Sequence, residues 1–347
     1  MASPQDGVID VHFPGSHILS IRQFERGDVD RVFAVADQMR PYAHRERITR
    51  VLEGAILGSM FFEPSTRTRI SFGSAFNLLG GEVRETTGFE STAIAKGESL
   101  FDTARVLSGY SDVIAMRHPV EGSVSEFSEG SRVPVINGGD GANEHPTQAL
   151  LDLYTIRSEL ADRGRSLDTL RVAMVGDLRF GRTVHSLSRL LQLFSDVQVK
   201  LVSPPELKMP GEIVEGFARS GHRVLETDSL EMGIADVDIV YSTRLQEERF
   251  NSPAEADLYR GRFRLNQGIY TANCEPNTVI MHPLPRDSRE GAQELDVDLN
   301  DNPNLAIFRQ SDNGVLVRMA LFALILDVAD QVDAHSRPVN WYTERRF

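Results

Sequence analysis

Residues 55–79, AILGSMFFEPSTRTRISFGSAFNLL, contain a predicted strand, a polar loop and a predicted helix in immediate succession. Residues 55–62 form an apolar run of the length of a buried strand, and residues 70–79 form a helix-like run. Strands that alternate with helices are typical of α/β proteins with parallel sheets. Because such segments alternate along nearly the whole chain, we predict an α/β fold.

The loop at residues 63–69 concentrates groups that bind anions. Three hydroxyl groups and two guanidinium groups occupy five consecutive positions, Ser65, Thr66, Arg67, Thr68 and Arg69. A helix N-terminus presents unpaired backbone N–H groups, and hydroxyl donors with an arginine fork complete a site for a phosphate dianion. Ordinary helix capping is the alternative, but a cap uses one hydroxyl, and arginine is unfavourable at the positive end of a helix. We therefore favour an anion site.

The bulk composition is that of a globular protein large enough for two domains. The chain has 347 residues, of which 41% are hydrophobic and 25% charged, and this excludes disordered and fibrous classes. A net charge of −13 argues against binding to nucleic acids or anionic membranes, so positive charge must be concentrated locally to hold an anionic ligand. The single cysteine, Cys274, excludes an intrachain disulfide and a multi-cysteine zinc site.

Neither a membrane anchor nor an export signal is expected. The longest apolar run, residues 319–326, is much shorter than the ~20 residues that cross a bilayer. The N-terminus lacks the basic, apolar and small-residue pattern of a signal peptide. A single cysteine also suits a reducing compartment, so we expect a cytoplasmic protein.

The strand and helix pattern predicts two parallel sheets, one in each half of the chain. The predicted strands are residues 55–62, 82–86, 113–117 and 133–137, then 171–175, 197–202, 223–226, 239–241 and 278–281. The predicted helices include residues 28–40, 100–108, 147–160 and a strongly apolar final helix at 315–329. The polar stretch at residues 161–168 is the candidate domain boundary, and the residues from 336 onward are expected to form a polar tail.

Polar residues follow several predicted strands, where open α/β sheets bind ligands. Arg117 closes one strand, although a surface ion pair is the alternative for this residue. His145 and Gln148 lie three residues apart at the start of a helix that Pro146 begins, so they share its opening turn. A lone histidine is more often structural, which is the alternative for His145.

The second half of the chain repeats this pattern. Residues 175–183, VGDLRFGRT, match neither the dinucleotide nor the P-loop spacing, but Gly181 permits a tight turn and Arg182 can reach a carboxylate. Arg244 and Gln246 can address the two ends of a small polar ligand, or they form an ordinary charged loop. Residues 282–286, HPLPR, carry two prolines that we expect to hold the segment extended and to supply backbone carbonyls to a substrate NH₂ group.

Five arginines lie in loops that follow predicted strands. An acidic protein concentrates guanidinium groups in loops, at Arg67, Arg117, Arg182, Arg244 and Arg249. This pattern implies at least two anionic ligands, one near Ser65 and Thr68 and one served by the second half of the chain. We expect the five side chains to converge on one crevice.

Together these motifs closely resemble the catalytic chains of the aspartate carbamoyltransferases, a branch of the transcarbamylase family. The motifs that carry the resemblance are residues 62–69, 145–148, 176–187, 243–246 and 282–286. The first two resemble motifs shared by all transcarbamylases, and the others resemble the aspartate-using branch. The ornithine-using branch is expected to carry a cysteine in place of Pro283.

The resemblance implies a transcarbamylase-like fold of two domains, each a mostly parallel sheet flanked by helices. Residues 1–160, completed by residues 314–335, correspond to the carbamoyl-phosphate-binding domain, and residues 161–313 correspond to the aspartate-binding domain. The implied activity is carbamoyl transfer from carbamoyl phosphate to L-aspartate in de novo pyrimidine biosynthesis. No cofactor and no metal are implied.

The resemblance also implies a role for each candidate site residue. The residues that hold the phosphate are Ser65, Thr66, Arg67 and Thr68, with Arg117 bridging phosphate and carbonyl. Thr68, Arg117 and His145 polarise the carbonyl oxygen as the catalytic residues. The carbamoyl NH₂ group is oriented by Gln148 and by the backbone carbonyls of Pro283 and Leu284. The aspartate carboxylates are held by Arg182, Arg244 and Gln246, with Lys96.

The implied assembly is a homotrimer whose active sites lie between subunits. A loop of the neighbouring subunit contributes Thr92 and Lys96 to each site, where Thr92 replaces the family's serine and Ala95 replaces a frequent basic residue. Regulatory or dihydroorotase-like chains are possible further partners. Glu63 is expected to pair with Arg182 or Arg249 when the two domains close. The alternatives are a transcarbamylase for another amine and a catalytically silent scaffold.

Overall fold

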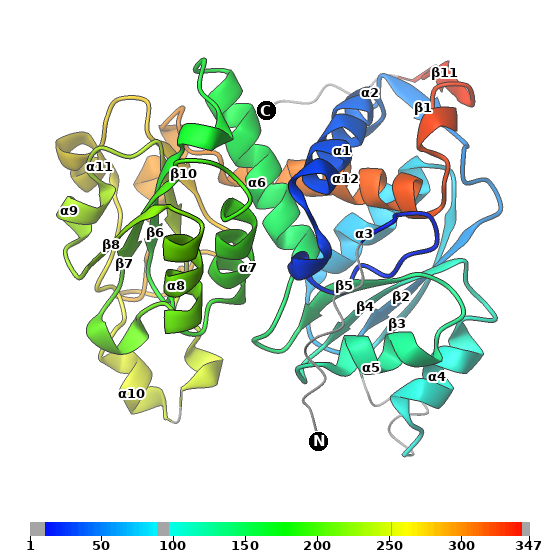
Figure 1. Cartoon of the computed structure of the whole chain (residues 1–347), viewed down its shortest axis with the longest axis horizontal. Coiled ribbons are helices and arrows are strands. Elements are labelled where there is room, and N and C mark those ends of the chain that lie inside the picture. The colour runs from blue at the N-terminus through cyan, green and yellow to red at the C-terminus, as the bar shows by residue number, and fades with distance from the viewer. Residues whose placement is uncertain (1–10, 89–96, 251, 342–347) are drawn as a thin grey trace. The chain divides into compact units, whose positions relative to one another are not determined.

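Both predicted sheets are present in the computed structural model, which describes residues 11–88, 97–250 and 252–341 (Figure 1). The described residues divide into two compact units. The first contains those up to Thr147 together with those from Gly314 onward, and the second contains those of Gln148–Asn313. Each unit has its own parallel sheet, and this confirms the predicted α/β class.

The sheet of the first unit has the strand order β3-β2-β4-β5, and all its strands are parallel. The strands are β2 (Ile56–Phe61), β3 (Glu82–Thr87), β4 (Val113–His118) and β5 (Val135–Asp140). All four were predicted, although β5 begins and ends later than expected. Because β3 and β4 lie on opposite sides of β2, the loops after β2 and β4 meet at a switch point, where such sheets bind ligands.

Alternating side chains of β2 explain why helices cover both faces of this sheet. Met60 and the following Phe62 pack with residues of α4 (Leu100–Leu107) and α5 (Ser123–Gly130). Phe61 points to the opposite face, where its ring centroid lies 6.3 Å from that of Phe72 in α3 (Thr66–Leu78). Figure 1 shows α4 and α5 on one face, and α3, α12 (Ile307–Ile325) and α1 (Arg26–Gln38) on the other.

The C-terminal part of the chain differs from the prediction in two ways. Helix α12 begins at Ile307 and not at residue 315. The prediction placed its start too late because the first turns carry polar residues, such as the buried Gln310, that break the apolar pattern. The residues from 336 are not simply a polar tail. Strand β11 (Ser336–Pro338) pairs antiparallel with β1 (Arg47–Thr49), and Arg47 Nε donates to the Ser336 hydroxyl over 3.2 Å.

The sheet of the second unit has the strand order β10-β9-β6-β7-β8 and is also parallel throughout. Its strands are β6 (Arg171–Val175), β7 (Gln198–Val202), β8 (Arg223–Thr227), β9 (Ile239–Ser242) and β10 (Val279–Met281). All five were predicted within a residue or two. Here β7 and β9 flank β6, so the loops after β6 and β9 meet at a second switch point.

Helices enclose this sheet too. Figure 1 shows α7 (Arg182–Leu191) and α8 (Gly211–Arg219) on one face, and α9 (Leu230–Ile234) and α11 (Gln267–Asn273) on the other. The core on the α9 and α11 face is continuous, with Ile234 and Tyr270 packed against strand residues such as Val240. The remaining α-helices of the described residues are α2 (Arg40–Ala43), α6 (Pro146–Ala161) and α10 (Pro253–Asp257). Within the described ranges, no helix is long and apolar enough to span a bilayer.

Candidate active site

The anion-binding loop lies at the switch point of the first sheet, between β2 and α3. Ser65 is the N-cap residue of α3, but its hydroxyl makes no capping hydrogen bond within the described part of the chain. Thr66 and Arg67 are exposed in the first turn, and Thr68 is half-buried. Arg69 instead pairs with Glu85 of β3, so this arginine has a structural partner. Capping therefore does not explain the hydroxyl groups, and one helix turn presents them together with Arg67.

Arg117 lies at the carboxyl end of β4, beside the same loop. Its backbone carbonyl accepts a hydrogen bond from the N–H of Phe62 over 2.9 Å. Its Nε donates to Glu63 Oε2 over 2.9 Å, and the residue is only 9% exposed. The ion-pair alternative is thus correct in part, but the partner belongs to the anion-binding loop. The pair fixes the guanidinium against Glu63, the first residue of that loop. The pairing of Glu63 with Arg182 or Arg249 stays a prediction.

His145 directly precedes α6, which Pro146 begins as predicted. The residue is buried, at 3% exposure. The preceding turn is fixed by Asp140, whose Oδ1 accepts hydrogen bonds from the N–H of Glu144 over 3.1 Å and from Asn137 Nδ2 over 3.0 Å. A buried imidazole on a rigid turn can act as an oriented hydrogen-bond donor.

Arg318 is a residue of this unit that the sequence analysis missed. It lies in the apolar part of α12 and is 3% exposed. Its guanidinium donates to Ser71 of α3 over 2.9 Å and to Thr147 over 3.3 Å, and it lies 4.8 Å from the Phe72 ring centroid. It therefore ties the helix of the anion-binding loop to the start of α6. An arginine within the apolar part of the predicted final helix was the available signal.

In the second unit, the buried Asp177 joins the two loops that meet at the switch point. It follows β6 and is 1% exposed. Its Oδ1 accepts the N–H of Phe180 over 3.0 Å, and its Oδ2 accepts the N–H of Gln246 over 3.1 Å. Burial raises the pKa of this carboxyl, and the backbone N–H donors oppose that shift. Asp177 therefore holds the loop that leads to Arg182 against the loop of Gln246.

Gly176, and not Gly181, is the glycine that requires a left-handed backbone. Gly176 has φ +119°, and a Cβ atom there would lie 2.3 Å from the Thr243 carbonyl oxygen. Gly181 has φ −76°, although its Cβ would also crowd the carbonyl oxygen of Asp177, at 2.6 Å. The close approach of Gly176 to Thr243 brings the two loops into contact.

Gly176→Ala is therefore expected to destabilise the second unit. Strain at this φ costs about 1–3 kcal/mol, and the clash with Thr243 adds to it. The measurement is urea unfolding monitored by circular dichroism. Gly164→Ala is a matched control, because Gly164 also has positive φ, at +66°, but no heavy atom lies within 4 Å of its Cβ position. Equal losses of stability in both variants would contradict a specific contact between the loops.

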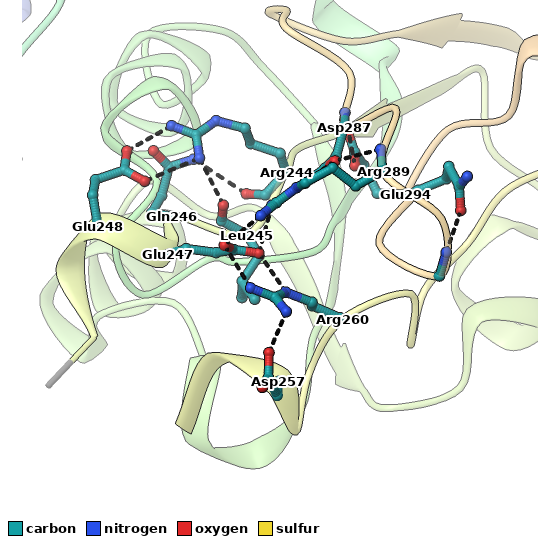
Figure 2. Close-up of polar contacts among 12 residues, drawn as sticks. Arg244, Leu245, Gln246, Glu247, Glu248, Asp257, Arg260, Asp287, Arg289 and Glu294 are labelled. Carbon is teal, nitrogen blue, oxygen red and sulfur yellow. Dashed lines mark hydrogen bonds and ion pairs between the residues drawn. The ribbon is translucent and has the colours of Figure 1, made fainter. Parts of the chain in front are cut away.

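Arg244 follows β9 and already has a carboxylate partner in the structure. Its Nη1 and Nη2 donate to the two oxygens of Glu248 over 3.0 and 2.5 Å, and Nη1 also donates to the Leu245 carbonyl over 2.9 Å (Figure 2). Gln246 Nε2 donates to the Arg244 carbonyl over 3.1 Å. The guanidinium is thus held in a geometry that binds a carboxylate, here that of Glu248.

Glu247 anchors the same loop through an ion cluster. Figure 2 shows its carboxylate between Arg260 and Arg289, with N–O distances of 2.7 and 2.9 Å to the first and 2.7 and 3.1 Å to the second. Hydrogen bonds from Arg260 and then Arg289 lower the pKa of Glu247 to about 2. A lowered pKa means that the pairing stabilises the fold above the unfolded-state pKa, and that this contribution is lost as pH falls through about 2.

Glu247→Gln is expected to lower the thermal midpoint at pH 7, with a difference that shrinks progressively below about pH 4.5, the unshifted value. The measurement is thermal unfolding of both proteins as a function of pH. Glu275→Gln, at an exposed position of the same unit, is the control. A midpoint difference that stays constant down to pH 2 would contradict the ionic origin of the effect.

The segment after β10 is turned and not extended, so that prediction was wrong. Leu284 has φ +59°, and its N–H donates to Nδ1 of His282 over 2.8 Å. The other imidazole nitrogen of His282, Nε2, lies 2.7 Å from Glu294 Oε1. This local hydrogen bond, which the prolines did not reveal, replaces the extended conformation. Pro283 and Leu284 still follow the strand directly, as predicted.

The predicted site residues fall into three groups. Those in the first unit are Ser65, Thr66, Arg67, Thr68, Arg117 and His145, and those in the second are Gln148, Arg182, Arg244, Gln246, Pro283 and Leu284. Thr92 and Lys96 lie outside the described residues. Among the described residues, no group of three or more His, Cys, Asp or Glu side chains is arranged to hold a metal ion.

Comparison with known proteins assigns a family to both halves of the chain. The model of the aspartate/ornithine carbamoyltransferase carbamoyl-P binding domain matches residues 16–158, and that of the Asp/Orn binding domain matches residues 168–325. The aspartate carbamoyltransferase catalytic subunit of Saccharophagus degradans is 76% identical over 96% of this chain and 99% of its own length. That of Cellvibrio japonicus is 72% identical over 97% and 99%.

Solved structures agree with the sequence matches. The catalytic subunit of M. jannaschii aspartate transcarbamoylase is 43% identical, with a TM-score of 0.81 over 90% of this chain and 98% of that one. The Trypanosoma cruzi aspartate transcarbamoylase in complex with N-(phosphonacetyl)-L-aspartic acid is 37% identical, with a TM-score of 0.83 over 90% and 97%. The predicted resemblance is confirmed, and the chain belongs to the aspartate/ornithine carbamoyltransferase family.

Proposed function

We propose that this chain transfers the carbamoyl group of carbamoyl phosphate to the amino group of L-aspartate, giving N-carbamoyl-L-aspartate and phosphate. The observation that carries this function is the 76% identity, over 96% of the chain, to a relative named aspartate carbamoyltransferase catalytic subunit. A Trypanosoma cruzi relative of known structure is described in complex with carbamoyl phosphate and aspartate. The name of the relatives also supports a place in pyrimidine biosynthesis.

The phosphate of carbamoyl phosphate is proposed to bind at the N-terminus of α3. The donors are the hydroxyl groups of Ser65, Thr66 and Thr68 and the guanidinium of Arg67. The absence of a capping bond from Ser65 among the described residues and the exposure of Arg67 support this role. Helix N–H groups and an arginine fork match the charge and shape of a phosphate dianion.

Stabilisation of the oxyanion is the proposed source of catalysis. Carbamoyl phosphate is already activated, so the reaction needs a positioned amine and donors for the developing negative charge, and no nucleophilic side chain is required. Thr68, Arg117 and His145 are the proposed donors. The ion pair that fixes Arg117 against the loop, and the burial of His145, support a preorganised site. Gln148, with the carbonyls of Pro283 and Leu284, is proposed to accept hydrogen bonds from the carbamoyl NH₂ group.

L-Aspartate is proposed to bind through Arg182, Arg244, Gln246 and Lys96. Two observations within the second unit support this assignment. The loop that leads to Arg182 and the loop of Gln246 share the buried Asp177, and Arg244 already binds a carboxylate, that of Glu248.

We propose residues 1–160 with 314–335 as the carbamoyl-phosphate domain and residues 161–313 as the aspartate domain, and the two family models support that order.

A cytoplasmic homotrimer with shared active sites is the proposed assembly, in which Thr92 and Lys96 serve the neighbouring subunit. The test is complementation between two inactive variants, Lys96→Ala and Arg117→Ala. Mixing them after mild dissociation is expected to restore activity, because some sites then receive both wild-type residues. Mixtures as inactive as the separate variants would contradict shared sites. Mass photometry of the same samples would reveal the trimer, and pull-downs would reveal regulatory or dihydroorotase-like partner chains.

The function itself is tested by assaying carbamoyl transfer to a panel of amino acids with purified protein. We expect L-aspartate to be the preferred acceptor and N-(phosphonacetyl)-L-aspartate to inhibit. Preference for ornithine or an N-acylated ornithine would favour another transcarbamylase. Absence of transfer to every amine tested would favour a silent scaffold.

A further inference from the structure

Asp152 is a fully buried carboxylate that accepts three side-chain hydrogen bonds within the second unit. It lies on α6, one turn after Gln148, and is 0% exposed. Its Oδ1 accepts Nε2 of Gln148 over 2.9 Å and Nε2 of Gln310 over 2.6 Å. Its Oδ2 accepts the hydroxyl of Tyr241 over 2.7 Å. A buried carboxylate is costly unless hydrogen bonds satisfy it, as they do here.

The carboxylate dictates which end of each amide faces it. An ionised carboxylate only accepts hydrogen bonds, whereas a glutamine amide has a donor end and an acceptor end. Gln148 and Gln310 must both turn Nε2 toward Asp152, so each amide oxygen points away from it. The oxygen of Gln148 is then the end of that side chain that remains to accept a hydrogen bond from a ligand.

Gln310 links Asp152 to the backbone of the segment after β10. Its Oε1 accepts the backbone N–H of His282 over 2.9 Å. The His282 ring in turn accepts the N–H of Leu284 over 2.8 Å, so the N–H groups flanking Pro283 are both committed. The backbone at Pro283 and Leu284 is therefore fixed by a chain of contacts that begins at Asp152.

We infer that Asp152 and Gln310 are positioning residues that make the site select a donor bearing an NH₂ group. This inference rests on the proposed function, which assigns the carbamoyl NH₂ group to Gln148, Pro283 and Leu284. The carboxylate of Asp152 orients the amide oxygen of Gln148 directly. Through Gln310 it also orients the backbone carbonyls of Pro283 and Leu284. All three then present oxygen, which matches the donor hydrogens of an NH₂ group and disfavours a group without donor hydrogens, such as methyl.

Tyr241 donates a hydrogen bond to Asp152 but, among the described residues, makes none with Gln148 or Gln310, so we expect it to play no part in selecting the NH₂ group. Burial first, and then the charge of Asp152, raise the pKa of Tyr241, so this hydroxyl keeps its proton and donates throughout the usual assay range. Removing it leaves the contacts from Gln148 and Gln310 to the opposite carboxylate oxygen in place. Tyr241→Phe is thus the matched control for a buried hydrogen bond in the same network.

The test compares a substrate that has the NH₂ group with a ligand that lacks it. In Asp152→Asn, the new amide can donate or accept, so the amide of Gln148 is free to reverse. We expect kcat/KM for carbamoyl phosphate to fall at least tenfold. The Kd of N-(phosphonacetyl)-L-aspartate, which has a methylene group and no carbamoyl NH₂, is expected to change less than threefold. Tyr241→Phe is expected to change both values less than threefold.

Equal losses in both values for Asp152→Asn would overturn the inference, since they would indicate a purely structural role. Unchanged kcat/KM would overturn it as well. If Asp152→Asn does not fold, as judged by circular dichroism, Gln310→Met decides the question with the same expected split between the two ligands. Wild-type protein that neither transfers to aspartate nor binds the analogue would instead refute the proposed function, so the two failures are distinguishable.

Discussion

Arg117→Ala is expected to lower turnover about a hundredfold, because a lost oxyanion donor raises the barrier by ~3 kcal/mol. In the structure, this guanidinium is buried and held by Glu63 beside the anion-binding loop. On the proposed assignment, its removal takes away a charged donor to the carbonyl oxygen, together with the ion pair to Glu63. The measurement is steady-state turnover at saturating carbamoyl phosphate and aspartate.

Arg69→Ala is the matched control for Arg117→Ala. Both guanidiniums lie near the same loop and both pair with a glutamate, but the partner of Arg69 is Glu85 of β3. Loss of this half-exposed pair is expected to cost at most ~1 kcal/mol of stability and to leave turnover within a few-fold. Similar turnover for Arg117→Ala and wild type would contradict the catalytic role of Arg117.

His145→Ala is expected to have a comparable effect, about a hundredfold in turnover, through loss of a second donor. His145→Gln discriminates between two roles for this side chain. A glutamine amide can donate a hydrogen bond but cannot act as a general base, so we expect His145→Gln to retain clearly more activity than His145→Ala. The measurement is turnover of the three proteins across pH 6–9. Equally inactive variants, together with loss of a pH-dependent limb, would indicate a general base.

The central strands and the placement of the loops were predictable from the sequence because strands such as β2 and β6 are short, mostly apolar runs. The run at residues 55–62 leads directly into the polar loop at Ser65, so the loop had to follow the strand's carboxyl end. The order of strands within each sheet was not predictable, because the sequence does not state which strands pair. That order places the loops after β2 and β4, and those after β6 and β9, side by side.

The supporting residues escaped sequence analysis for a common physical reason. Asp152, Asp177, Gln310 and Arg318 each gain their role from a partner far away in the sequence, and the sequence does not state which residues meet. Gln310, for example, meets Asp152 across 158 positions. The turn at Leu284 was missed because the His282 side chain, not a proline or glycine, determines the backbone there.

The central claim is that arginines from separate stretches of an acidic chain serve one ligand with a phosphate end and a dicarboxylate end. A crystal structure with N-(phosphonacetyl)-L-aspartate bound tests it most directly. We predict guanidinium nitrogens of Arg67 and Arg117 within about 3.2 Å of the phosphonate or carbonyl oxygens, and those of Arg182 and Arg244 within that distance of the carboxylates. An analogue bound elsewhere, with these four guanidiniums on unrelated faces, would contradict the account.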